Sequence, residues 1–179
     1  MEEDKEEEEE ILGLDADDEE DEMITLKSKE GKGYSVGKAP AMMSNLIKIT
    51  LDGDQEAKEI DLKHIEGPVV EKVIQYMTYH VKVAPRKIEK PLQSTNMKEL
   101  VDEFDAGFVD TDQPTMFKLL LAANYLDIKS LLNLVCAKIA SLMKGKTPDQ
   151  IRKIFNIRSD YTPEEEEQVR RDHRDLISC

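Results

Sequence analysis

One segment of the sequence matches the pattern of a nucleophilic serine, Gly33-Tyr-Ser35-Val-Gly37. In a hydrolase, this pattern needs a strand before the serine, a helix straight after it, and an acid and then a histidine downstream. Here a predicted hairpin turn precedes the segment, and Pro40 delays the next helix. The histidines His64, His80 and His173 lie in no recognisable catalytic context. We therefore interpret the match as a coincidence.

The rest of the chain contains no pattern that predicts catalysis or a cofactor. A phosphate-binding loop, dinucleotide-binding glycines, an H-E-x-x-H motif and a cysteine–histidine metal cluster are all missing from the sequence. His80 has no second ligand at metal spacing, so we expect it to be a helix cap or a surface residue. The sequence therefore predicts a protein that is not an enzyme and holds no cofactor and no metal.

The cysteines and the hydrophobic segments bear on the compartment. Cys136, within a predicted helix, is expected to be a small buried hydrophobe, and Cys179 is the last residue. The two residues make no disulfide framework, which suits a reducing cytoplasm or nucleus. No signal segment and no run of 18 apolar residues is present, so neither secretion nor membrane spanning is expected.

Negative charge is concentrated at the start of the chain. The sequence has 179 residues and a formal charge of −14, and residues 1–22 alone, with fifteen acids and one lysine, carry −14. The rest is neutral and has no basic footprint for nucleic acid. Such an acidic segment cannot bury enough apolar surface to order itself, which predicts a disordered tail. It is a solvated tail, or it binds basic proteins as an acidic chaperone would.

The segment from Pro114 to Lys144 is predicted to form two helices joined at Asp127, with more apolar residues than one core requires. A helix that covers one core needs a single apolar stripe. Here each helix has two rows, and the outer row must be covered by more chain or by a partner. The core rows are Leu119, Leu120, Ala123 and Leu126, then Leu131, Leu134, Val135 and Leu142. The outer rows are Phe117, Leu121 and Tyr125, then Leu132, Cys136, Ile139 and Met143.

The preceding part reads as a mixture of strands and helices. Alternating apolar residues predict a hairpin over residues 24–36 and a third strand over 58–62. Helices are predicted over 40–49, from Pro68 and over 98–104, with a mobile loop at 81–95 and Phe108 tucked into the core. The fold class is therefore α+β.

Two further helices are predicted after residue 145. Thr147 and Thr162 are each followed by proline and by a capping-box acceptor three residues on. In the last helix, Glu166 and Glu167 stand four residues before Arg170 and Arg171, the favourable order for ion pairs. Its only apolar residues are Val169, Leu176 and Ile177, so it should fray without a partner.

Four long segments resemble the S-phase kinase-associated protein family, the adaptors of SCF ubiquitin ligases. They are residues 121–129 (LAANYLDIK), 144–148 (KGKTP), 151–157 (IRKIFNI) and 164–170 (EEEEQVR). The resemblance implies a BTB/POZ fold, a small three-stranded sheet beside a helical core, over residues 23–144. It also implies a two-helix extension over residues 145–179.

The resemblance further implies two interfaces. The BTB-like part, with Asn124, Tyr125 and Phe117, should bind a cullin, with Phe117 close to either interface. The RING subunit and the E2 would be indirect partners, and the free protein is expected to be able to dimerise through its exposed apolar surface. The extension should bind F-box proteins, through Leu132, Cys136, Ile139, Met143, Ile151, Phe155 and Ile157.

Pro163 has two interpretations. As the first residue of a helix, a proline needs no further function. The stretch Tyr161-Thr-Pro-Glu-Glu resembles protist adaptors, in which the matching proline is hydroxylated by an oxygen-dependent prolyl hydroxylase and then glycosylated. The resemblance thus implies a prolyl hydroxylase and glycosyltransferases as further partners.

The chain departs from the family pattern in three places. These are the acidic residues 1–22, a basic 81–95 loop where relatives often have an acidic one, and residues 173–179 in place of a tryptophan-cysteine ending. An elongin-C-like adaptor is the alternative within binding modules, but that family usually lacks the extension at 147–171.

Overall fold

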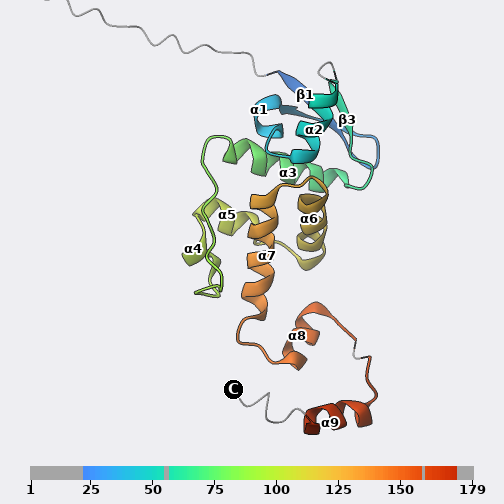
Figure 1. Ribbon diagram of the computed structural model, residues 1–179, viewed down its shortest axis with the longest axis vertical. Coiled ribbons are helices and arrows are strands. Elements are labelled where there is room, and N and C mark those ends of the chain that lie inside the picture. The colour runs from blue at the N-terminus through green and yellow to red at the C-terminus, as the bar shows by residue number, and fades with distance from the viewer. Residues whose placement is uncertain (1–21, 55–56, 159, 173–179) are drawn as a thin grey trace, which may run out of the picture.

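The computed structural model describes residues 22–54, 57–158 and 160–172 (Figure 1). The predicted acidic tail, apart from Glu22, lies outside the described residues, as do His173, Leu176, Ile177 and Cys179. A small sheet lies at one end of the described chain, packed with the helices of the body. A helical extension, formed by the C-terminal part, lies at the other end (Figure 1). This arrangement confirms the predicted α+β class.

The sheet has three strands in the order β2-β1-β3. β1 (Met23–Lys27) pairs antiparallel with β2 (Gly33–Gly37) and parallel with β3 (Glu59–Asp61). Alternation along the strands buries Ile24, Leu26 and Val36 on one face of the sheet, because successive side chains point to opposite faces. The predicted hairpin and third strand are confirmed.

The single helix predicted over residues 40–49 is in fact two short ones, α1 (Lys38–Ala41) and α2 (Asn45–Gly53). The break lies at Ser44, whose buried hydroxyl oxygen accepts a hydrogen bond from the Ile47 N–H at 3.2 Å. The same hydroxyl donates to the Leu126 carbonyl at 2.6 Å. A serine that caps a helix in this way starts a new one, so the apolar pattern, which runs across the break, was misleading.

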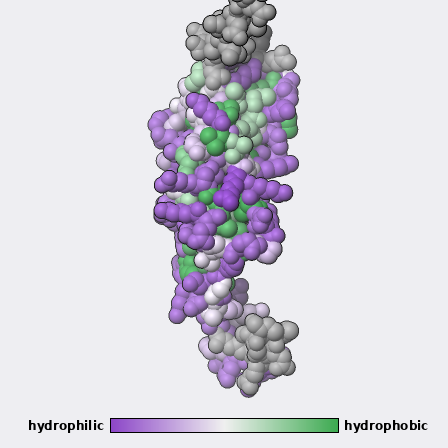
Figure 2. All heavy atoms as spheres, turned by 90° about the vertical axis from the view of Figure 1, so that its left-hand side faces the viewer, coloured by the Kyte–Doolittle hydropathy of each residue, from purple (hydrophilic) through white to green (hydrophobic). Residues whose placement is uncertain are grey.

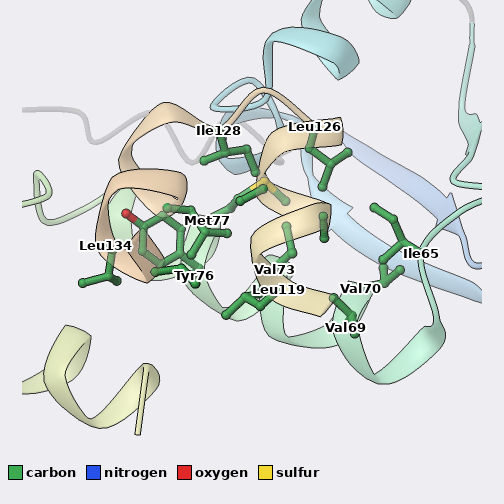
Figure 3. Packing of buried hydrophobic residues seen from close by; sticks show 14 of the residues in the cluster. Ile65, Val69, Val70, Val73, Tyr76, Met77, Leu119, Leu126, Ile128 and Leu134 are labelled. Carbon is green, nitrogen blue, oxygen red and sulfur yellow. The ribbon is translucent and has the colours of Figure 1, made fainter. Parts of the chain in front are cut away.

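α3 (Gly67–His80) begins one residue before the predicted proline, Pro68, and is the central helix of the core. Its buried side chains include Val73, Tyr76 and Met77, which pack with Leu119 and Leu134 from the helical hairpin (Figure 3). The hairpin consists of α6 (Gln113–Tyr125) and α7 (Lys129–Met143). Asp127 lies between them with a positive φ of 49°, which confirms the predicted joint.

The segment between α3 and the hairpin contains an irregular stretch at residues 81–96 and two short helices, α4 (Met97–Leu100) and α5 (Glu103–Phe108). One helix had been predicted over residues 98–104. Asp102 interrupts it, because its side chain accepts a hydrogen bond from the Asp105 N–H at 2.8 Å and caps α5. Phe108 is buried, as predicted.

His80 is neither a cap nor a surface residue, so that prediction was wrong. Its side chain is buried, with Nε2 2.9 Å from Asp105 Oδ1 and Nδ1 2.8 Å from the Val83 carbonyl oxygen. A carbonyl only accepts hydrogen bonds, so Nδ1 carries a proton. One further proton lies between Nε2 and Asp105, on either partner. The His80–Asp105 pair therefore has no net charge in either arrangement.

After α7 the chain extends away from the sheet as α8 (Pro148–Phe155) and α9 (Pro163–Asp172) (Figure 1). Both predicted capping boxes are present. The Gln150 N–H donates to Thr147 Oγ1 at 3.3 Å, and the Glu165 N–H donates to Thr162 Oγ1 at 3.3 Å. The return bonds from the Thr147 and Thr162 N–H groups measure 3.0 and 2.8 Å.

Candidate functional site

The serine motif does not form a catalytic site within the described chain. Ser35 lies in the middle of β2, opposite Thr25 of β1, and not at a strand-to-helix turn. The following helix, α1, begins at Lys38, two residues before Pro40, where a helix start had been predicted. Ser35 nevertheless lies within the strand and not at the junction between strand and helix. The His80 ring is bonded to Asp105, and the His64 ring lies against Tyr125.

The described ranges contain neither a metal-binding cluster nor a membrane-spanning helix. No group of three or more histidine, cysteine, aspartate or glutamate residues there could hold a metal ion. None of the helices in that part of the chain is both long enough and apolar enough to span a bilayer.

The outer row of α6 borders a hollow that we name the α6 groove. Leu121 is 68% exposed, Asn124 is exposed and Tyr125 is half-buried. The Tyr125 ring lies edge-on to His64, with centroids 5.5 Å apart. The groove has a volume of about 470 Å³ and is lined by His64, Ile65, Glu66, Val69, Lys118, Leu121, Ala122, Asn124 and Tyr125.

Two members of the α6 groove had no signal in the sequence. His64 comes from the turn after β3, and Glu66 precedes α3, where it pairs with Lys118 at 2.7 Å. The helical spacing of Leu121 and Tyr125 predicted that they share one row of α6. No local pattern in the sequence predicts that His64 and Glu66 lie beside that row. The groove is thus lined by apolar side chains together with one ion pair, Glu66–Lys118.

Phe117 lies apart from the α6 groove, since it does not line it. Its ring lies 6.0 Å from the ring of Phe155 in α8, at 63°. The side chain of Gln113, one turn earlier, donates to the Ile154 carbonyl at 2.5 Å. The start of α6 therefore anchors α8 and brings Phe117 to the second predicted interface.

That second interface, which we name the α7–α8 face, is built from the outer row of α7 and the apolar side of α8. Cys136 and Met143 are exposed, and Cys136 is a free thiol, so the prediction of a buried cysteine was wrong. Cys136 follows Leu132 by one helical turn and shares its outward side. The face consists of Leu132, Cys136, Ile139, Met143, Ile151, Phe155 and Ile157, which are all half-buried or exposed.

α9 contacts α8 through charged side chains. Arg152 Nη1 lies 2.9 Å from Glu166 Oε1 and 3.1 Å from Asp149 Oδ1. Glu166 thus has a cationic partner in α8. The Arg170 side chain, its predicted partner along α9, lies outside the described part of the chain, so that pairing stays a prediction. A hollow of about 380 Å³ lies between the helices, bordered by Pro148, Tyr161 and Val169. Pro163, at the first position of α9, is exposed.

Comparison with known proteins connects these features to one family. Residues 22–82 match the tetramerisation domain of the Skp1 family, and residues 129–175 match its dimerisation domain. The chain is 43% identical over 152 residues to the S-phase kinase-associated protein 1 homolog of Tetrahymena thermophila, covering 84% of this chain and 92% of that protein.

Two further relatives extend the comparison to plants and fungi. SKP1-like protein 1A of Arabidopsis thaliana is 41% identical over 151 residues, covering 84% of this chain and 94% of that protein. The E3 ubiquitin ligase complex SCF subunit sconC of Talaromyces marneffei is 40% identical over 151 residues, with the same two coverages. The chain belongs to the Skp1 family, and its α+β body has the POZ fold that was predicted.

Proposed function

We propose that this protein is the adaptor subunit of an SCF-type E3 ubiquitin ligase, which joins a cullin to F-box substrate receptors. Its family membership supports this role, as does the name of the fungal relative, which is an SCF subunit. In such a complex the RING subunit and the E2 carry out the ubiquitin chemistry, and the adaptor itself is not catalytic.

One observation carries the proposal: the α6–α7 hairpin exposes apolar side chains on two separate sides. Leu121 and Tyr125 of α6 border the α6 groove, whereas Cys136 and Met143 of α7 belong to the α7–α8 face. Contiguous exposed apolar patches on a small protein mark interaction sites. Two such patches on one rigid hairpin are what a protein needs in order to hold two partners at once.

The groove is assigned to the cullin and the α7–α8 face to the F-box. Asn124 and Tyr125 are two of the four groove residues within the 121–129 segment, which resembles the adaptor family, and they carry its polar groups. The tyrosine supplies a large ring with a polar tip, the kind of side chain that dominates interface energies. On the other face, the half-buried Ile151 and Phe155 of α8 would extend the outer row of α7 into a broader apolar surface for a helical F-box.

A two-partner pull-down from native lysate, read by mass spectrometry, tests the assignment. Asn124→Lys/Tyr125→Lys should lose the cullin and keep F-box proteins, and Ile151→Asp/Phe155→Asp should do the reverse. Thr78→Lys/Val81→Lys, on exposed residues outside both surfaces, is the matched control and should keep both partners. Absence of both partner classes from the wild type would show that the family resemblance reports the fold alone.

Pro163 adds a modification site to the proposal. It is exposed and begins α9, so an enzyme can reach it without unfolding the body. We propose that a prolyl hydroxylase and glycosyltransferases act there, and that a glycan shifts the order of α9 and thereby F-box exchange. Intact-mass measurement on protein from native cells should show hydroxylated and sugar-bearing forms. A single unmodified mass would contradict this.

The free protein also has expected properties of its own: self-association, a cellular location and a restricted set of ligands. The free protein should self-associate through the α7–α8 face, because F-box binding would cover the same apolar side chains. We propose a cytoplasmic and nuclear location and no binding to nucleic acid or membrane. Light scattering of the free chain, before and after addition of an F-box protein, tests the dimer, which should dissociate.

A further inference from the structure

A cavity unrelated to either proposed interface lies beneath the irregular segment that follows α3. Its volume is about 600 Å³, within the range of small-molecule sites. Residues 85–90 and Gln93 form its roof, and α3, α5 and α7 form its floor. Hydrophilic side chains dominate the middle of the side of the molecule that carries this segment (Figure 2).

The roof is tied to the body at three points. The Val83 carbonyl accepts from His80 Nδ1 at 2.8 Å, and Lys90 Nζ donates to Asn133 Oδ1 of α7 at 3.1 Å. Lys144 Nζ donates to the Leu92 carbonyl. These contacts hold the roof over the floor.

The lining is positively charged, although the whole chain is acidic. Arg86, Lys87 and Lys90 come from the roof. Asp105 is in the floor, but with His80 it forms a pair of zero net charge, which leaves Glu89 as the acid that opposes three cations. Guanidinium and ammonium groups in such a cluster recognise phosphate.

The floor adds neutral hydrogen-bond donors. The Tyr76 side chain borders the cavity and is fully buried, and its hydroxyl makes no hydrogen bond of normal geometry within the described residues. Burial raises the pKa of the Tyr76 hydroxyl, and the nearby Ser130 hydroxyl opposes this effect. The Tyr76 hydroxyl therefore stays neutral and can donate a hydrogen bond. Ser130 lies in the first turn of α7, whose cap residue Ile128 provides no side-chain acceptor. The positive end of that helix dipole thus borders the cavity.

We propose that this cavity binds a small phosphorylated organic molecule. Its phosphate would lie between Arg86 and Lys87 of the roof and the first turn of α7. Ile88, Pro85 and Leu134 line the remainder and would contact the organic part. A bare phosphate would fill only a small part of 600 Å³, which is why the proposal is an organic phosphate and not the ion alone.

The test titrates ribose 5-phosphate, compared with inorganic phosphate and without divalent cations, into the full-length protein. Amide NMR and calorimetry follow the binding. Arg86→Gln/Lys87→Gln removes two lining charges and leaves the Lys90 anchor in place. Lys82→Gln/Lys98→Gln removes the same charge from exposed neighbours outside the lining. Tyr76→Phe removes the unpaired hydroxyl at nearly constant volume, and circular dichroism checks that every variant is folded.

We expect saturable binding by the wild type, with shifts at the Ser130 and Asn133 amides. The Arg86/Lys87 variant should bind about tenfold or more weakly, since two charge-assisted contacts are lost. The control pair should change affinity by less than about twofold, because charges outside the site are screened by solvent, and Tyr76→Phe should weaken binding while the fold remains intact. No saturable binding at low salt, or equal weakening by both charge pairs, would overturn the proposal.

Discussion

The rings of Phe117 and Phe155 lie 6.0 Å apart in an edge-to-face arrangement, and they join the first turns of α6 to the end of α8. Phe117 is 38% exposed and Phe155 is half-buried, so a partner that covers one ring also covers part of the other. This pair connects the POZ body to the extension. It places Phe117 of α6 next to Phe155, a member of the α7–α8 face.

A double-mutant cycle on this pair gives the first prediction. Because edge-to-face aromatic pairs contribute about 0.5–1.5 kcal/mol beyond their buried area, we expect a coupling energy of that size between Phe117→Ala and Phe155→Ala. Phe117→Ala should also increase hydrogen exchange in α8 and weaken F-box binding more than cullin binding. Coupling near zero, with unchanged exchange in α8, would show that the two rings act independently.

The second prediction concerns the energy of the α6 groove. Tyr125→Ala should weaken cullin binding by about 2 kcal/mol or more, as truncation of a central aromatic residue does. F-box affinity should stay within about twofold, because Tyr125 is outside the α7–α8 face. Calorimetry with a purified cullin N-terminal domain and a purified F-box protein measures both values. His64→Ala, which removes the ring beside Tyr125, should have a smaller effect of the same sign.

The elements around these surfaces could largely be predicted from sequence, because they follow from local patterns. The apolar spacing in α6 and α7 predicts the hairpin, and Thr147 and Thr162 predict the starts of α8 and α9. Short helices were the harder case. Ser44 and Asp102 each begin a new helix inside a stretch whose apolar pattern is continuous, so one helix was predicted where two occur.

Contacts between distant residues had no such signal. His80 and Asp105 are 25 residues apart, with an irregular segment between them, and nothing local shows that the histidine is buried. Arg152 and Glu166 lie on different helices, so no local pattern in the sequence predicts their ion pair. Phe117 could be assigned to a row of α6 by spacing, but only the position of α8 shows what faces it.

The third prediction is that the buried pair His80–Asp105 holds the residues 81–83 in place. Burial raises the pKa of Asp105, opposed by the hydrogen bond and charge of His80. Asp105→Ala leaves the His80 ring without its partner and should cost about 3 kcal/mol of unfolding free energy, the usual loss when one side of a buried pair is removed. Urea denaturation measures the loss.

Asp105→Asn is the matched control for the same pair. An asparagine amide can donate to Nε2 of a neutral His80, while Nδ1–H keeps its bond to the Val83 carbonyl. This variant should therefore stay within about 1 kcal/mol of the wild type, since each buried polar group keeps a partner. Equal losses in Asp105→Ala and Asp105→Asn would mean that the negative charge of Asp105, and not the hydrogen bond, stabilises the pair.

The fourth prediction is a pH dependence at the start of α3. Glu30 Oε2 accepts from the Gly67 N–H at 3.0 Å. The Ser28 hydroxyl and then the Gly67 N–H lower the pKa of Glu30 from its ordinary value of 4.5. Because the folded state prefers the charged form, this stabilisation is present above pH 4.5 and is lost as the pH falls through the lowered pKa.

The variant Glu30→Gln tests that dependence. It should have a lower melting temperature than the wild type at neutral pH, and the difference should shrink as the pH is lowered below 4.5. Scanning calorimetry over a pH series gives both curves. Glu71→Gln, on an exposed turn of α3, removes the same charge elsewhere on the helix and is the matched control. A Glu30→Gln difference that stays constant into acid would exclude the carboxylate as its source.

The fifth prediction concerns how α9 is held against α8, which in the proposed adaptor would set the access of an F-box partner and of an enzyme acting on Pro163. Arg152 links α8 to Glu166 of α9 at 2.9 Å, and both side chains are about 30% exposed. Pairs of this kind contribute about 0–1 kcal/mol, so Arg152→Glu should hardly change global unfolding. It should, however, increase hydrogen exchange and proteolysis between α8 and α9, because little apolar surface anchors α9. The charge exchange Arg152→Glu/Glu166→Arg should restore protection against hydrogen exchange and proteolysis. If it does not, packing around Tyr161 and Val169, and not the ion pair, holds α9 in place.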